Sequence, residues 1–175
     1  GTGVTPLSNG NYVVISSQWT NGTITSAGAV TWGSGATGIS GTVSAANSLV
    51  GSVASDQVGS SGVVALSNGN YVVRSQTWNN GGTAQAGAAT WANGASGIVG
   101  TVSATNSLVG STAGDNVGGN VTALTNGNYV VSSSNWDNGT VVNAGAATWG
   151  NGGSGITGVV SPANSLVGSQ ASDRV

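Results

Sequence analysis

The chain has 175 residues, of which two are basic and four acidic, so its net charge at pH 7 is only −2. With so few cationic side chains it cannot neutralise a run of phosphates, so we do not expect nucleic acid as a partner. No apolar run approaches the roughly 20 residues of a membrane-spanning helix, and the absence of His and Cys excludes zinc-type metal sites.

The first predicted element is a β-hairpin in residues 7–14, which read Leu-Ser-Asn-Gly-Asn-Tyr-Val-Val. Asn-Gly between apolar, β-branched runs is a strong signal for a two-residue type I′ turn, because both central residues then need a positive φ. Matching motifs follow at residues 66–73 and 124–131. A type I′ turn in the last copy would pair Leu124 with Tyr129.

The hairpin motif belongs to a tandem repeat with a period of 58 to 59 residues. The recurring large side chains are Tyr12, Tyr71 and Tyr129; Trp19, Trp78 and Trp136; Trp32, Trp91 and Trp149; and Leu49, Leu108 and Leu166. Only one connection varies in length, since residues 117–124 are one residue shorter than residues 58–66. We therefore divide the chain into repeats 1–58, 59–117 and 118–175, which together form one structural domain.

Each repeat is predicted to hold four short strands. In the second repeat these are residues 62–66, 70–78, 86–91 and 107–111, separated by turns rich in Asn and Gly. No window shows the periodicity of a helix. The third strand consists of small residues and ends in Trp91, which is the taper expected of a wedge-shaped blade. The sequence therefore predicts an all-β, β-propeller-like fold with one four-stranded blade per repeat.

The three repeats resemble the FG-GAP repeats of integrin α-subunit propellers and their bacterial relatives. Asp-Asn-Val-Gly at 115–118 takes the place of the family's Phe-Gly pair, Val-Val-Ser-Ser at 130–133 that of its Gly-Ala-Pro strand, and Ala-Gly-Ala at 144–146 that of its Gly-Ala start. Val58 and Val117 replace the family's aromatic residue. The family's acidic calcium loop is replaced by the Asn-Gly turn, so that calcium binding is not implied.

Closed propellers have about 4 to 8 blades, so three blades are too few to close a ring. Counted across a junction of the two chain ends, Asp173 lies 14 residues before Tyr12, which equals the spacing from Asp115 to Tyr129. We therefore expect a homodimer with head-to-tail blade contacts, which would complete six blades. A threefold β-prism or β-trefoil and a parallel β-helix are the alternative architectures.

Three Trp residues are the candidate ligand-binding positions, because Trp19, Trp78 and Trp136 each precede a turn at the end of the second strand. Such rings could stack on a sugar, with Asp137 supplying hydrogen bonds, or they could fill the gap between neighbouring blades. Glycans are therefore the second candidate partner, beside a further copy of the chain.

Asp56, Asp115 and Asp173 recur at one position, where we expect a carboxylate bonded to backbone N–H groups rather than a calcium site. Without His, Cys, Lys or Glu, no catalytic residue, metal ligand or cofactor is assigned. Sparse charge with abundant Ser, Thr and Asn is typical of bacterial surface proteins. The sequence thus predicts a non-enzymatic structural or adhesive module, extracellular or on the cell surface. The alternative is a multivalent carbohydrate-binding lectin with one shallow site per repeat.

Overall fold

The structure is a computed structural model that describes residues 3–175. These residues form β-strands and no helix, so none of them belongs to a helix that could cross a membrane. The strands are β1 (Gly3–Pro6), β2 (Tyr12–Ser16), β3 (Ala29–Gly33), β4 (Leu49–Val50), β5 (Val63–Ala65), β6 (Tyr71–Ser75), β7 (Ala88–Ala92), β8 (Gly100–Thr101), β9 (Leu108–Val109), β10 (Asn120–Ala123), β11 (Tyr129–Ser133), β12 (Ala146–Gly150), β13 (Gly158–Val159) and β14 (Leu166–Val167).

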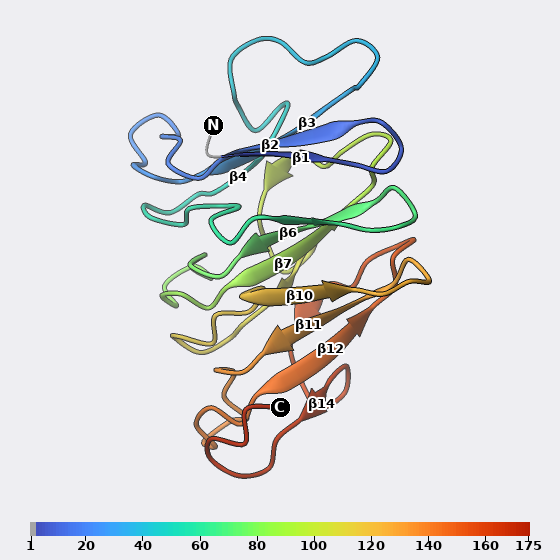
Figure 1. Cartoon of the computed structure of the whole chain (residues 1–175). Helices are drawn as coiled ribbons and strands as arrows, with labels where there is room; N and C mark the ends of the chain where they lie inside the picture. The colour runs from blue at the N-terminus through green and yellow to red at the C-terminus, as the bar shows by residue number, and fades with distance from the viewer. Residues whose placement is uncertain (1–2) are drawn as a thin grey trace.

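Each repeat folds into an antiparallel sheet of four strands, in the orders β1-β2-β3-β4, β5-β6-β7-β9 and β10-β11-β12-β14. Figure 1 shows the three sheets as successive layers, with β1 in the first layer and β14 in the last. The prediction of an all-β fold with three four-stranded blades is confirmed. The layers form an open row, and the first and last sheets lie at opposite ends of it (Figure 1).

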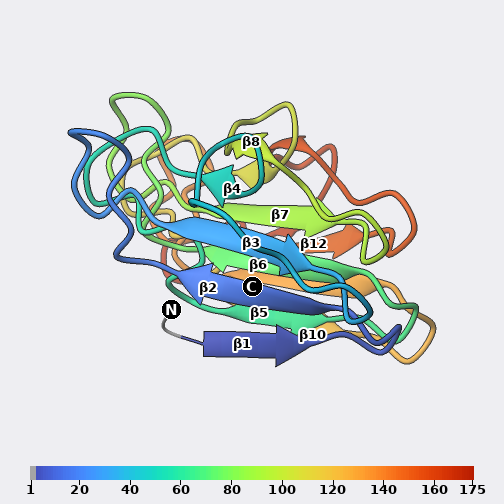
Figure 2. The same ribbon diagram turned by 90° about the horizontal axis from the view of Figure 1, so that it is seen from above.

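Two further strands, which were not predicted from the sequence, join neighbouring repeats. β8 of the second repeat adds in parallel to β4 of the first, and β13 of the third adds in parallel to β9 of the second. Seen down the row in Figure 2, β1, β5 and β10 lie along one edge of the stack, whereas β4 and β8 lie at the other. We call the contact between repeats 1 and 2, joined by β4 and β8, the first seam, and that between repeats 2 and 3, joined by β9 and β13, the second seam.

The hydrophobic core lies in the two seams. Leu49 packs in the first seam with Val73 and Val102, and Leu108 packs in the second with Val131 and Val160. Tyr71, Val72 and Val73 of β6 are all buried, the first and last facing the first seam and Val72 the second. The consecutive apolar residues of this strand are explained by the sheets that cover both of its faces.

The hairpin turns differ from the prediction by one residue of register. Tyr129 pairs with Ala123 rather than with Leu124, whose N–H donates instead to the Asn128 carbonyl at 2.8 Å. The loop therefore has three residues and closes as a type I turn followed by Gly127 at a φ of 86°, a common alternative to the two-residue turn. Asn126 keeps a negative φ because its side chain turns back and accepts from the Asn128 N–H at 3.1 Å.

Candidate functional site

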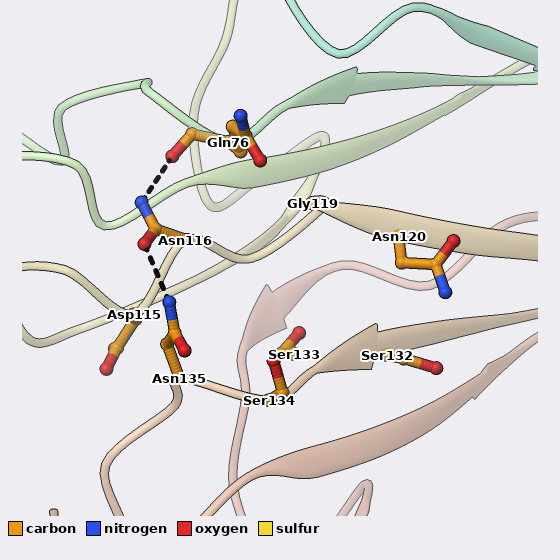
Figure 3. A pocket seen from close by; sticks show the side chains of 9 residues that line it. All are labelled: Gln76, Asp115, Asn116, Gly119, Asn120, Ser132, Ser133, Ser134 and Asn135. Carbon is orange, nitrogen blue, oxygen red and sulfur yellow. Dashed lines mark hydrogen bonds between the residues drawn. The ribbon is translucent and has the colours of Figure 1, made fainter. Parts of the chain in front are cut away.

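A polar hollow of about 260 Å³ opens at the second seam (Figure 3). Amides, hydroxyls and one carboxylate line it. They come from the turn after β6, from the connection between β9 and β10, from the start of β10, and from β11 and the turn after it. The lining residues are Gln76, Asp115, Asn116, Gly119, Asn120, Ser132, Ser133, Ser134 and Asn135. Such a lining could hydrogen-bond a small polar molecule, but it contains no His, Cys or Lys to activate one.

A row of amides bridges the two repeats across this hollow (Figure 3). The Asn116 side chain donates to the Gln76 carbonyl at 3.2 Å, and its own oxygen accepts from the Asn135 amide at 3.1 Å. Nearby, the Arg74 guanidinium donates to the carbonyls of Gly118, at 3.3 Å, and Gly119. Burial lowers the pKa of Arg74. The side chains around the hollow therefore tie the repeats together.

The hollow has a structural cause in the shorter connection of the second seam. In the first seam Ser75 Oγ accepts from the Gly59 N–H at 3.1 Å, and Ser60 Oγ bonds Thr77 Oγ1 at 3.1 Å. Ser133, the counterpart of Ser75, has a buried hydroxyl without a partner within residues 3–175. One residue fewer in the connection thus leaves this part of the second seam open.

Asp115, at the base of the hollow, is 1% exposed. Its Oδ2 accepts from the N–H groups of Ser111 and Thr112, both at 2.8 Å, and its Oδ1 accepts from the Asp137 N–H across the seam at 3.1 Å. Burial raises the pKa of Asp115, against the effect of these hydrogen bonds. The expectation of a carboxylate bonded to backbone N–H groups is confirmed.

Asp56 repeats this arrangement in the first seam, where its Oδ1 accepts from the Asn79 N–H at 3.0 Å. Asp137 is half-buried and accepts from the Asn143 N–H at 2.7 Å, so it is bound within its own turn. Within the described part of the chain, no group of three acidic, His or Cys residues is placed to hold a metal ion. These carboxylates therefore have structural partners.

Two of the three candidate sugar-binding rings lie inside the stack. Trp78 and Trp136 are each 3% exposed and belong to the cores of the first and second seams. Their ring faces are covered by the preceding repeat, so that a sugar could reach them only if the seam opened. Trp19 lies on the first repeat and is half-buried. Sugar stacking in the assembled stack stays a prediction for Trp19 alone.

The second set of Trp residues ties each repeat to the one that follows. Trp32 Nε1 donates to the Gly94 carbonyl at 2.9 Å, and Trp91 Nε1 donates to the Gly152 carbonyl at 3.0 Å. The Asn70 side chain donates to the same Gly152 carbonyl at 2.8 Å. Each seam thus combines an apolar core with the same Trp and Asn hydrogen bonds to one glycine carbonyl of the following repeat.

Comparison with protein families gives a match over nearly the whole chain. The model of a family described as Repeat of unknown function (DUF5650) matches residues 6–60, 65–119 and 123–175. The chain belongs to this family. No curated protein and no solved structure matches the chain.

Each of the three DUF5650 repeats carries the same contact surface, but within residues 3–175 another repeat covers it only in repeats 1 and 2. Leu49 and Leu108 have no exposed surface, whereas Leu166 is 71% exposed. Trp149, the counterpart of Trp32 and Trp91, is likewise 52% exposed. We call the uncovered surface of repeat 3 around Trp149 and Leu166 the trailing face.

The opposite end of the row carries a complementary feature. A hollow of about 130 Å³ lies on the first repeat, and we call the surface around it the leading face. Its lining residues are Val14, Ser16, Thr31, Ile39, Ser40, Gly41, Val43 and Asn47. This site was not among the sequence predictions, although the sequence carries a signal for it. Gly-Thr-Val at 41–43 recurs at 100–102 and, as Gly-Val-Val, at 158–160, where it forms β8 and β13.

Proposed function

We propose that this chain is a non-enzymatic structural or adhesive repeat module of an extracellular or cell-surface bacterial protein. The observation that carries the proposal is the repeated seam, in which neighbouring repeats bury their apolar side chains against each other. In proteins of this design, stability is approximately a sum of repeat and neighbour-contact contributions, so a row of any length can act as a spacer or scaffold.

The distribution of polar groups supports the non-enzymatic part of the proposal. Catalysis by carboxylates needs groups that are free to exchange protons with a substrate. Asp56 and Asp115 instead accept hydrogen bonds from three backbone N–H groups each, and they are almost fully buried. These carboxylates therefore hold backbone segments together at the seams.

The composition supports the extracellular location. Only six charged side chains and many Ser, Thr and Asn residues are typical of bacterial surface proteins rather than of cytosolic enzymes. The resemblance to FG-GAP repeats, which belong to adhesive integrin subunits and bacterial relatives, supports the same location. A distant kinship with FG-GAP repeats is part of the proposal.

A tandem fusion of two copies, joined from Val175 to Gly1, tests the structural role. If the repeats are stacking units, the fusion gains one additional seam, between repeat 3 of the first copy and repeat 1 of the second. It should then melt in one transition, several degrees above the single chain. The matched control is the same fusion with Leu166→Asp in its first copy, which should lose the gain. A fusion that melts at the temperature of the single chain, or in two steps, would refute the role.

A carbohydrate-binding lectin is the second candidate, and the polar hollow at the second seam favours it. The hydroxyls of Ser132 and Ser134 and the side-chain oxygen of Asn135 line this hollow and are groups that could bond sugar hydroxyls. A glycan array with the wild type, Asn135→Ala and Trp19→Ala variants would decide. Binding that disappears in either variant while the melting temperature is kept favours the lectin. An array without signal excludes it.

A further inference from the structure

We propose that the chain binds a second copy of itself head to tail. Leu166 of the first copy enters the leading-face hollow of the second copy, and residues 41–43 of the second copy pair in parallel with β14 of the first. The inference rests on the proposed stacking function and names its partner and contact. The partner is a second copy of the chain because the leading face and the trailing face are complementary. Within one chain, the same two kinds of surface already contact each other at both seams.

The backbone half of this contact is the same in both seams. In the first seam the Gly100 N–H donates to the carbonyls of Ala45 and Ser48, each at 3.0 Å, and the Val102 N–H donates to Val50 at 3.1 Å. In the second seam the counterparts donate in the same way. The Gly158 N–H donates to the carbonyls of Ala104 and Ser107, and the Val160 N–H donates to Val109, at 3.0 Å in every case.

The third set of these groups is split between the two ends of the row. The counterparts of the donors are Gly41 and Val43, and within residues 3–175 their N–H groups donate to no protein atom. The counterparts of the acceptors are the carbonyls of Pro162, Ser165 and Val167. Strand addition between two copies would join these donors to these acceptors in the register already used twice.

The side-chain half is a leucine seated among three β-branched residues. Leu49 belongs to one core with Val73, Ile98 and Val102. Leu108 has the counterparts of those three in the second seam, Val131, Ile156 and Val160. On the leading face, the residues at the same three positions line the hollow: Val14, Ile39 and Val43. Leu166, the leucine that would fill it, is 71% exposed at the other end.

A carboxylate contact points to the same pairing. Asp56 and Asp115 each reach across a seam with Oδ1, to the N–H of Asn79 at 3.0 Å and of Asp137 at 3.1 Å. The counterpart carboxylate, Asp173, accepts through Oδ2 from Ser169 and Gln170 within its own turn, at 2.9 and 2.8 Å. Head-to-tail packing would bring its Oδ1 to the N–H of Thr20 in the second copy, the position equivalent to Asn79 and Asp137.

Light scattering on the purified chain, from micromolar to near-millimolar concentration, measures the association. The expected mass is twice the 16.6 kDa of one chain, if six blades close a ring, or a ladder of multiples, if the row stays open. Either result supports the contact. A single 16.6 kDa species over the whole range would overturn it.

Two variants locate the contact, one on each face. Leu166→Asp removes the trailing face and Val43→Asp the leading face, and each should weaken association about 10- to 100-fold. Mixing the two variants should restore a heterodimer, because each keeps the face that the other has lost. A mixture that stays monomeric, or variants that associate like the wild type, would overturn the proposal. Circular dichroism and melting curves check that both variants fold.

The matched control is Val99→Asp, the same kind of change at a residue that is 53% exposed in the middle repeat and belongs to neither end face. It should associate like the wild type. The tandem fusion separates this inference from the proposed function. If the fusion is stabilised but separate chains stay monomeric, only the self-association is refuted. If the fusion gains nothing, the stacking function itself is refuted.

Discussion

Leu108 and Leu166 occupy the same position in successive repeats, but Leu108 has no exposed surface and Leu166 is 71% exposed. The difference comes from the neighbour, because β13 pairs with β9 whereas β14 has no such partner among the described strands. Position in the row, rather than local sequence, therefore decides how much a residue contributes to stability.

We first predict that the same substitution has unequal costs at these two leucines. Leu108→Ala should lower the free energy of unfolding by about 2–5 kcal/mol, because it leaves a cavity in the second seam. Leu166→Ala should change it by less than about 0.5 kcal/mol. Urea unfolding at a concentration where light scattering gives a monomer measures both. Equal costs at the two positions would contradict the seam as the source of stability.

The second prediction concerns the hairpin turn of the middle repeat. Gly69 has a φ of 88°, and a Cβ added to it would lie 3.3 Å from the Asn9 side chain of the first repeat. Gly69→Val should therefore cost about 1–3 kcal/mol in unfolding free energy. Gly82→Val is the control, since Gly82 is exposed, has no positive φ and would meet no atom within 4 Å. The control should unfold like the wild type.

The third prediction is a loss of stability in alkali that depends on Tyr129. Burial raises the pKa of this phenol from its ordinary value of 10.0 to about 12. The native state therefore holds the proton more tightly than the unfolded chain, and the stability this supplies is complete below pH 10 and is lost as the pH rises toward 12. Between about pH 9 and about pH 11.5 the loss should reach about 2 kcal/mol.

Urea titrations at the two pH values measure this loss in the wild type and in Tyr129→Phe. The variant has no phenol to ionise at this position, so its unfolding free energy should fall less over the same interval. A parallel fall in both proteins would mean that other groups cause the alkaline loss.

Calcium removal gives the fourth prediction. Chelation should leave the melting temperature unchanged, because calcium takes about 6 to 8 oxygen ligands and the recurring Asp supplies one carboxylate per repeat. In the structure, Oδ2 of Asp56, Asp115 and Asp173 accepts from two backbone N–H groups in each case. A shift of several degrees on addition of a chelator would reveal a bound ion.

The local elements of the fold were predictable because each has a local cause. The Asn-Gly motifs located the hairpins, and the spacing of Tyr, Trp and Leu located the repeats. The exact register was not predictable, because the Asn126 side chain satisfies the Asn128 N–H and thereby favours a three-residue loop over the two-residue one.

The missed features depend on contacts between residues far apart in the chain. β8 has two residues, too few to show an alternation, and it pairs with a strand some fifty positions earlier. The polar hollow arises from a one-residue deletion that was visible in the sequence. Its consequence, an unpartnered Ser133 hydroxyl, depends on how two sheets pack. Likewise, the exposure of the Trp rings could not be predicted without knowing which face each repeat buries.

The parallel pairing of β4 with β8 also sets an order of events during synthesis. A ribosome makes Leu49 before it makes Val102. The leucine of each finished repeat therefore stays exposed until about fifty further residues have been made and the next repeat can pack on it. A growing chain therefore always presents one uncovered leucine on its newest complete repeat. Nascent chains translated side by side on one message would meet each other through that leucine, at the stage when each still lacks its own next repeat.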